Sequence, residues 1–389
     1  MHAEVRMARI VEAVGLYRTG KVTCEEAASW LGMSERHFRR LRDRYETEGA
    51  DGIIDRRRGR ASGRRAPVDQ VEWMIDQFMT RYFDFTVKHF HEEIAKRGFV
   101  YSYTWTKMML QRSGLVRPKR KLTARHRKKR PRRPLPGMML FQDGSTHEWL
   151  AGQPPLDLIV TLDDATAEIY SIFLVEQEGT ASSFRGLAET IGKVGLFSSF
   201  YTDRGSHYFL TPKAGEKVSK DTATQVGRAL AELGIRHIPS YSPQARGRME
   251  RVWGTLQGRL PQLLRLEQIT TIEAANRFLA EVYLAEHNAN FAVAAAEEGT
   301  AFTPFVGDLA GVLCAKHERQ VGNDNCVRFG KLDLQIPEQR HRRHYVRVTV
   351  QVRHYADGAL AIFHGPRRLA DYTAEGTLIT GERATLSAA

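Results

Sequence analysis

A run of basic residues, 117–133, constrains how this chain can fold, because a folded core does not accommodate it. Eleven of its 17 positions are Lys or Arg, and burying charge at that density is prohibitive. We therefore expect a linker over 117–136, ended by Pro134 and Pro136. A nuclear-import signal and a solvated tail are the alternatives to a segment that binds DNA phosphates. The linker residues assigned to phosphate contact are Lys119, Arg120, Lys121, Lys128, Lys129 and Arg130.

Charge is distributed unequally on the two sides of this linker. Residues 1–136 contain 32 Lys and Arg against 16 Asp and Glu, whereas residues 137–389 contain 26 against 29. The basic excess therefore lies entirely in the N-terminal third. This asymmetry predicts an N-terminal part that binds nucleic acid and a nearly neutral C-terminal part that carries another activity.

The overall composition indicates a globular protein of several domains. At 389 residues and 42% hydrophobic content, the chain is long enough for two to four domains. It has no apolar stretch long enough for a membrane span, and its first residues lack a secretory core. We expect a cytoplasmic, nucleoid-associated protein without membrane contact. Cys24, Cys314 and Cys326 are too few and too widely spaced for a disulfide framework or a zinc module.

The segment from Thr23 to Tyr45 has the pattern of a helix-turn-helix. Ala27, Ala28 and Leu31 are expected to pack the first helix, Gly32 to form the turn and Ser34 to cap the second helix. Phe38, Leu41 and Tyr45 would then be buried, which leaves three arginines for a DNA major groove. A generic helical bundle with a charged, solvated face is the alternative. The predicted groove-facing residues are Arg36, Arg39 and Arg40.

A second helical region, 66–116, follows a basic joint over 55–65. Phe90 and Ile94 mark one helix, and Ser102 caps another that is predicted to pack through Trp105, Met108 and Met109. Lys107 is expected on its exposed face as a DNA contact, although a structural or dimerising role fits this region equally well. The joint itself is expected to follow a DNA groove through Arg56, Arg57 and Arg58.

Three carboxylates in the C-terminal part have local sequences that suit an active site. Asp143 and Asp203 each end a short apolar, strand-like segment, and Glu250 lies beside a helical stripe that includes Met249, Trp253 and Leu256. Two strand ends and one helix can bring three carboxylates together, and carboxylate oxygens are the ligands that Mg²⁺ prefers. The expected cofactor is Mg²⁺ or Mn²⁺, as two ions that clamp an in-line displacement at phosphorus. The alternative is two turn residues and one solvated helix residue.

The segments around these acids resemble the three catalytic blocks of DDE transposases and retroviral-type integrases, and bacterial ISNCY insertion-sequence transposases most closely. The matching residues are 141–145, 201–206 and 242–251. This resemblance implies a ribonuclease-H-like core, divalent metal, and cleavage and joining of double-stranded DNA at element ends. It also implies that Asp143, Asp203 and Glu250 are the catalytic and metal-binding acids.

Two further predictions concern turns and the C-terminal region. Asp163 and Asp164 lie between two predicted strands and are interpreted as hairpin-turn residues, with a role as rival metal ligands as the alternative. Residues 345–352 and 359–364 alternate in polarity around the turn 355–358 and predict a hairpin. This hairpin is expected to belong to a small β-barrel that resembles the SH3-like module of integrases.

The predicted chain is therefore multidomain, with all-α helix-turn-helix units, an α/β ribonuclease-H-like core and a C-terminal barrel. The expected function is a DNA transposase that binds terminal inverted repeats and target DNA as a homo-oligomer. A structure-selective nuclease of the same fold, or a DNA-binding regulator with a silent catalytic domain, is the alternative. The predicted segments are 1–60, 66–116, 117–136 (linker), 137–296 (catalytic core), 297–326 (linker), 327–378 (barrel) and 379–389 (tail).

Overall fold

The computed structural model describes residues 2–54, 66–118, 130–210, 223–241 and 247–379. It divides into two compact units, Met1–Met74 and Ile75–Ala389. Each unit is described by itself below.

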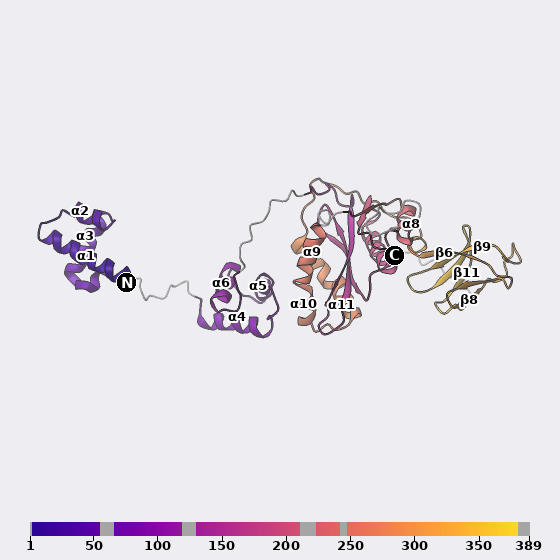
Figure 1. Ribbon diagram of the computed structural model, residues 1–389, viewed down its shortest axis with the longest axis horizontal. Helices are drawn as coiled ribbons and strands as arrows, with labels where there is room; N and C mark the ends of the chain where they lie inside the picture. The colour runs from indigo at the N-terminus through magenta and orange to yellow at the C-terminus, as the bar shows by residue number, and fades with distance from the viewer. Residues whose placement is uncertain (1, 55–65, 119–129, 211–222, 242–246, 380–389) are drawn as a thin grey trace. The chain divides into compact units, whose positions relative to one another are not determined.

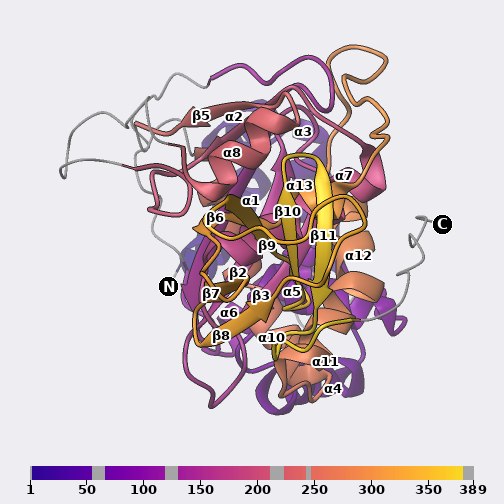
Figure 2. The same ribbon diagram turned by 90° about the vertical axis from the view of Figure 1, so that its right-hand side faces the viewer.

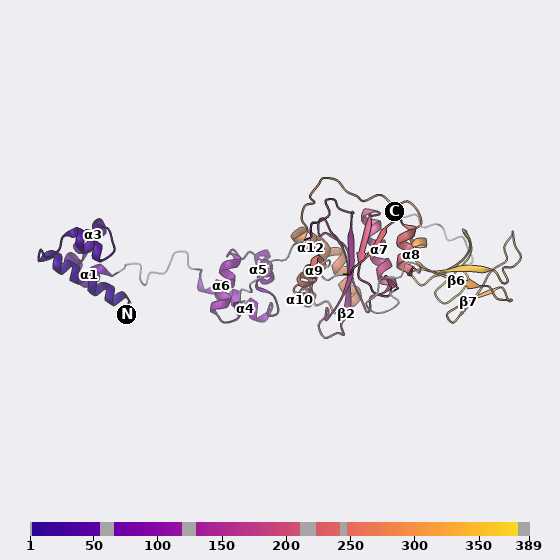
Figure 3. The ribbon, with the colours of Figure 1, turned by 45° about the horizontal axis from the view of Figure 1, so that its top comes forward.

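The first unit begins with three helices and a short 3-10 turn (Figure 3). These elements are α1 (His2–Arg18), α2 (Cys24–Trp30), α3 (Glu35–Glu48) and η1 (Gly49–Ile53). Thr23 and Glu26 form a capping box at the start of α2, and the Ser34 side chain accepts a hydrogen bond from the backbone N–H of His37 at the start of α3. Gly32 has a φ of +63° in the intervening turn, a conformation that favours glycine.

The predicted packing of α2 against α3 is confirmed. Ala27, Ala28, Phe38 and Leu41 are all buried in one cluster with residues of α1. The exposed face of α3 is consequently the face that carries arginine side chains.

A second group of helices comprises α4 (Val68–Thr80), α5 (Val87–Lys96) and α6 (Tyr103–Arg112). Phe90 and Ile94 are buried in α5, and Ser102 caps α6, as predicted. The predicted packing stripe of α6 is wrong at Met108, which is 38% exposed. Thr106 and Leu110 are fully buried instead, because residues four apart lie on the same helix face and this pair is the one that faces inward.

The second unit contains a five-stranded mixed sheet. Its strands are β1 (Leu140–His147), β2 (Leu156–Asp163), β3 (Ile169–Val175), β4 (Ser199–Thr202) and β5 (Arg236–Pro239). They lie in the order β3-β2-β1-β4-β5, with β1 to β3 antiparallel and β1, β4 and β5 parallel. Along the chain, the first three strands are consecutive and helices alternate with the strands after them.

Helices cover both faces of this sheet (Figure 1). One face carries α7 (Thr180–Val194) and α8 (Gln225–Glu232), and the other carries α9 (Gly247–Gln257), α10 (Leu260–Leu266) and α11 (Ile272–Phe278). A π-helical turn (Leu279–Tyr283) and α12 (Leu284–Phe291) follow α11. Leu140 packs on the α7 side and Phe141 on the α9 side, because successive strand residues point to opposite faces.

The helical stripe that includes Met249, Trp253 and Leu256 belongs to α9, and a second helix follows it directly. Gln257 ends α9, and α10 begins at Leu260 with Pro261 in its first turn. Proline is tolerated at a helix start but not in a helix interior, so it marks the break. Leu264 is buried in α10, whereas Leu263 is only partly buried.

The C-terminal β region consists of an open antiparallel sheet and a separate hairpin. After α13 (Leu309–Val312), the sheet contains β6 (Ala315–Gln320), β9 (Thr349–His354), β10 (Leu360–His364) and β11 (Arg367–Tyr372). The hairpin pairs β7 (Cys326–Phe329) with β8 (Leu332–Gln335). Figure 2 shows β9, β10 and β11 side by side, in the order β11-β10-β9-β6.

Two predictions for this region need correction. The expected small barrel is not confirmed, since the strand pairs of the described residues form an open sheet and a hairpin rather than a closed cylinder. The predicted hairpin is present as β9–β10, but its first strand begins at Thr349 instead of Tyr345. Arg347 has a φ of +60°, which is incompatible with an extended strand.

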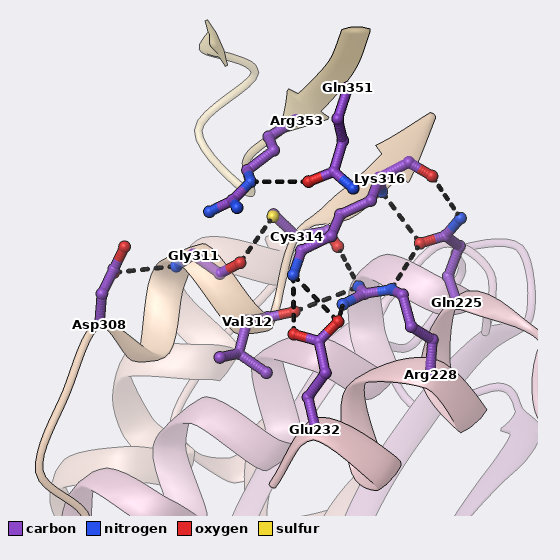
Figure 4. Close-up of polar contacts among 10 residues, drawn as sticks. All are labelled: Gln225, Arg228, Glu232, Asp308, Gly311, Val312, Cys314, Lys316, Gln351 and Arg353. Carbon is purple, nitrogen blue, oxygen red and sulfur yellow. Dashed lines mark hydrogen bonds and ion pairs between the residues drawn. The ribbon is translucent and has the colours of Figure 1, made fainter. Parts of the chain in front are cut away.

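Side chains of α8 bind the segment that leads into β6 (Figure 4). The Arg228 guanidinium donates to the carbonyl oxygens of Val312 and Cys314, at 3.2 and 2.6 Å. The Gln225 amide exchanges two hydrogen bonds with the backbone of Lys316, and the Lys316 ammonium pairs with Glu232 at 2.7 Å. The start of the C-terminal sheet is therefore fixed to the helix that covers β4 and β5.

Candidate active site

Asp143 and Asp203 are brought together by the pairing of two parallel strands. Phe141 of β1 lies opposite Tyr201 of β4, and each aspartate is two residues further along its chain. Asp143 does not end its strand as predicted: it lies inside β1, opposite Val160 of β2, because β1 continues to pair with β2 beyond its last pair with β4. Its side chain lies where the parallel pairing with β4 ends, and functional groups in α/β sheets gather at such points. The Asp203 carboxylate accepts a hydrogen bond from the Gly205 N–H at 2.8 Å, which orients it in the turn after β4.

Glu250 reaches the same place from α9. This helix packs on β1 through Met249 and Leu256, which are both buried in the sheet core. Two side chains of α9 also bind β1: the indole N–H of Trp253 donates to Asp143 at 3.0 Å, and the Gln257 amide donates to the Ser145 hydroxyl at 3.0 Å. Glu250 is exposed in the first turn of the helix.

The three acids line one open cleft of about 750 Å³. The cleft contains a fourth carboxylate, Glu178, which sequence reasoning missed. In the sequence, Glu178 is an acid in the loop between the end of β3 and the start of α7. Many solvated acids occupy such loops, so its position alone does not indicate a site. Glu178 lies so close to Gly144 that a methyl group there would collide with the carboxylate. Glycine at 144 therefore allows an acid to lie beside Asp143.

His207 pairs with Glu178, with 3.4 Å between the imidazole Nε2 and the carboxylate. It is mostly buried against Tyr208, with 4.0 Å between the two ring centroids. The Tyr208 hydroxyl donates to Gln142 at 2.9 Å, and Gln142 in turn donates to Thr161 at 3.0 Å. Burial raises the pKa of Tyr208 well above its usual value. The Tyr208 hydroxyl, which binds the residue before Asp143, is therefore uncharged.

A second buried histidine supports the other strand end. His237 of β5 is hydrogen-bonded to the Thr202 hydroxyl at 2.9 Å and stacks on Phe209 at 4.0 Å. Burial lowers the pKa of His237 to about 4, so the imidazole is neutral at pH 7. The residue immediately before Asp203 is thus held by an uncharged partner.

The donor set of this cleft is made of carboxylate oxygens, which suit hard divalent cations such as Mg²⁺ and Mn²⁺. Within the described ranges, no three His, Cys, Asp or Glu side chains lie close enough together to hold a metal ion. The cleft therefore has the right ligand chemistry, with acids placed around its rim.

Asp163 and Asp164 do not belong to this cleft. Asp163 accepts backbone hydrogen bonds from Ala165 and Thr166 within its turn and from Gly137, so the hairpin-turn prediction is confirmed for it. Asp164 is also a residue of this turn, as predicted, but its carboxylate binds the side chains of Arg130 and Arg248. Both aspartates are fully buried, and neither lines the cleft, which also argues against the metal-ligand alternative.

The predicted DNA contacts lie in several places. Arg36, Arg39 and Arg40 are exposed on α3, where Arg39 pairs with Glu35, and Lys107 is exposed on α6. Arg130 binds Asp164, so it is engaged within the protein. The remaining predicted contacts lie outside the described residues: Arg56, Arg57, Arg58, Lys119, Arg120, Lys121, Lys128 and Lys129.

Comparison with known proteins identifies relatives over most of the chain. A family model described as a winged helix-turn helix matches residues 11–70. A protein of Sinorhizobium fredii described as transposase y4bF is 30% identical over 357 residues, which cover 90% of this chain and 77% of that protein. The transposase for insertion sequence IS1202 of Streptococcus pneumoniae is 26% identical over 364 residues, covering 85% of this chain and 78% of that protein.

Two solved structures are also similar to this chain. A chain of the simian T-cell lymphotropic virus intasome, in complex with PP2A regulatory subunit B56 gamma, matches 67% of this chain and 84% of that chain, at 16% identity and a TM-score of 0.32. The HTLV-2 integrase catalytic core domain in complex with magnesium (dimeric form) matches 38% of this chain and 89% of that chain, at 16% identity and a TM-score of 0.28.

Among the helices of the described residues, none is long and apolar enough to cross a membrane.

Proposed function

The chain belongs to the transposase family that includes y4bF of S. fredii, and from this premise we propose that it cleaves DNA at the ends of its element and joins those ends to target DNA. The observation that carries the proposal is the cleft that Asp143, Asp203 and Glu250 line, from two parallel strands and one helix. The sheet order β3-β2-β1-β4-β5 with helices on both faces supports a ribonuclease-H-like core.

Asp143, Asp203 and Glu250 are the residues proposed to hold Mg²⁺ or Mn²⁺, as one or two ions. When bound, such ions activate the attacking hydroxyl and stabilise charge that develops at the phosphorus. Neighbouring side chains and backbone groups of the protein orient these carboxylates. Trp253 holds one oxygen of Asp143, the Gly205 N–H holds Asp203, and Gln257 fixes α9 against β1. Each contact reduces the reorganisation required when DNA enters the cleft.

DNA recognition is assigned to the N-terminal helices and the basic linker. Arg36 and Arg40 lie on the exposed face of α3, where an arginine can make bidentate contacts to guanine in a major groove. Alanine at either position should narrow the affinity gap between terminal-repeat DNA and random DNA by about 1–3 kcal/mol. Arg18→Ala, at the end of α1, is the matched control. Equal losses on both DNAs would assign these arginines to phosphates.

The linker is proposed to bind phosphates without reading sequence. Each phosphate that the protein neutralises contributes roughly 0.9 to the slope of log affinity against log salt. Replacing five or six Lys and Arg residues of 117–133 by glutamine should therefore flatten that slope by several units and preserve specificity. An unchanged slope would show that the linker makes no phosphate contacts.

The proposed reaction is tested with the intact protein and DNA that carries the sequences flanking its gene. Asp203→Asn should bind this DNA with unchanged affinity and should neither cleave nor join it, because the amide keeps the shape and loses the charge. Asp333→Asn, an exposed carboxylate in the β7–β8 hairpin, is the matched control and should stay active. Cleavage by Asp203→Asn at the wild-type rate would refute the assignment. Cleavage without joining would favour a nuclease, and binding without cleavage by the wild type would favour a regulator.

A further inference from the structure

We propose that Asp164 is a positioning residue for strand cleavage, which fixes the rotation of α9, and thereby the direction of Glu250, through Arg248. This inference rests on the proposed function for its effect on catalysis. Its structural part concerns only how α9 is held, and it is measurable without any activity.

Asp164 occupies the turn between β2 and β3, where it is fully buried. A buried carboxylate is stable only with charged and hydrogen-bonding partners. Its oxygens bind the guanidinium groups of Arg130 and Arg248 and the backbone N–H of Arg133, the last at 2.8 Å. Its backbone carbonyl accepts a hydrogen bond from the side chain of Arg132 at 3.0 Å. One turn residue therefore joins two segments that are distant in sequence.

The first of these segments is the start of the catalytic helix. Arg248 is the second residue of α9, and its other terminal nitrogen donates to the backbone carbonyl of Arg130 at 2.8 Å. Successive residues of an α-helix are rotated by about 100°, so two residues further along the direction has turned by about 200°. A helix held by Arg248 on one side consequently presents Glu250 on nearly the opposite side.

Fixing this rotation matters because Glu250 lies in the first turn of an 11-residue helix. Trp253 and Gln257 bind β1 in the second half of the helix. The first turn, which carries Glu250, is held by the burial of Met249 and by the ion pair of Arg248. Loss of the Asp164 ion pair leaves the packing of Met249 and the hydrogen bond from Arg248 to the Arg130 carbonyl. A neutral carbonyl holds a guanidinium less firmly than a carboxylate does.

The second segment joined by Asp164 is the end of the basic linker. Arg130, Arg132 and Arg133 all contact Asp164, and the linker is the segment proposed to bind DNA phosphates. Any displacement of this segment by DNA must act on the same carboxylate that holds Arg248. We therefore infer that DNA contact at the linker and placement of Glu250 are energetically coupled through Asp164.

Asp163 provides a matched control within the same turn. It is equally buried, but among the described residues its carboxylate accepts hydrogen bonds from the backbone N–H groups of Gly137, Ala165 and Thr166 and from the Thr166 hydroxyl, and none of these belongs to α9. Replacing it disturbs the turn without removing a contact to α9. Asp163→Asn thus separates a general loss of stability from a specific loss of helix placement.

The test uses hydrogen exchange of the full-length protein, measured on peptides that cover residues 247–257. Asp164→Asn and Arg248→Gln should each raise the exchange rate of the first turn of α9 by about tenfold or more, Arg248→Lys should restore part of the protection, and Asp163→Asn should leave it unchanged. With saturating terminal-repeat DNA, the first two variants should lower the cleavage rate constant, with the dissociation constant for that DNA unchanged.

Wild-type protection of α9 in both Asp164→Asn and Arg248→Gln, or equal deprotection in Asp163→Asn, would overturn the inference. If Asp164→Asn does not fold, Arg248→Gln and Arg248→Lys decide the outcome, because their side chains leave the turn itself intact. A wild-type protein that cleaves no DNA would refute the proposed function, whereas the exchange of α9 would still decide the role of Asp164.

Discussion

The turn between β2 and β3 and the cleft beside β1 both contain aspartates, but the two pairs of aspartates have opposite environments. Asp163 and Asp164 are fully buried and surrounded by backbone N–H groups and arginines. Asp143 and Asp203 remain partly exposed on the wall of an open cleft, and Glu250 is exposed. A buried carboxylate saturated by protein donors stabilises the fold, whereas carboxylates gathered around a solvent-filled cleft have capacity for a ligand. Surroundings, rather than residue type, separate the two roles.

The largest effect expected from this comparison is in the cleft. Glu250→Gln should lower the rate of DNA cleavage by about 10³-fold, since removal of one charge-stabilising group at a reaction centre typically has an effect of that size. Its free energy of unfolding should change by less than about 0.5 kcal/mol, because the side chain is exposed. Single-turnover cleavage and urea unfolding measure the two quantities. A large loss of stability with cleavage intact would show that Glu250 stabilises the fold, as the turn aspartates do, and does not support cleavage.

A smaller effect is expected for the group that orients Asp143. Trp253→Phe removes the indole N–H that donates to this carboxylate at 3.0 Å and keeps most of the ring. Loss of a residue that orients a metal-holding side chain typically lowers activity by 10- to 100-fold, and we expect a decrease of about tenfold in cleavage rate. Trp105→Phe, on α6, is the control and should retain full activity. Equal activities of the two variants would show that Asp143 needs no orientation.

Substitution of Asp163 in the turn should lower the free energy of unfolding and leave the cleavage rate unchanged. Asp163→Asn places an amide N–H₂ among three backbone donors and should cost about 1–3 kcal/mol of unfolding free energy, as an unsatisfied buried group does. At a temperature where the variant is folded, its cleavage rate should equal that of the wild type. Urea unfolding combined with the cleavage assay checks both statements. A thousandfold loss of cleavage in a folded variant would place Asp163 with the catalytic acids.

The same residue predicts a small pH dependence. Burial raises the pKa of Asp163 above its usual 3.8, against the opposing effect of its backbone donors. An acid whose folded pKa is raised binds more protons in the folded state, so its contribution to stability is full below pH 3.8 and is lost as pH rises through the folded pKa. The stability of the wild type relative to Asp163→Asn should therefore decrease from pH 4 to pH 7. A difference that grows with pH would show that the donors outweigh burial.

Local sequence was sufficient for the features that depend on nearby residues. The Ser34 and Ser102 caps, the turn at Gly32, and the buried Phe38 and Ile94 all follow from spacing along one or two elements. The strand end before Asp203 was predictable for the same reason, whereas the strand end predicted at Asp143 was wrong because β1 continues to His147 in its pairing with β2. Their place in one cleft depends on the parallel pairing of β1 with β4, which the resemblance to transposases anticipated.

Contacts between residues that are distant in sequence could not be predicted from local patterns. The ion pair of Asp164 with Arg248 spans 84 residues, and no local pattern distinguishes that aspartate from Asp163 beside it. Glu178 enters the cleft only because Gly144, on another strand, leaves space for it. The open C-terminal sheet differs from the expected barrel because closure depends on which strands pair at the edges, and alternation in one hairpin does not specify this.

The central claim is that Asp143, Asp203 and Glu250 form one divalent-metal centre for DNA strand cleavage. Titration of the full-length protein with Mn²⁺, followed by electron paramagnetic resonance of the free ion, measures this without DNA. We expect the wild type and Asp333→Asn to bind Mn²⁺ and Mg²⁺ to compete for the same site. Asp143→Asn, Asp203→Asn and Glu250→Gln should each weaken Mn²⁺ binding by about tenfold or more. Equal Mn²⁺ affinity in the wild type and all three cleft variants would contradict it.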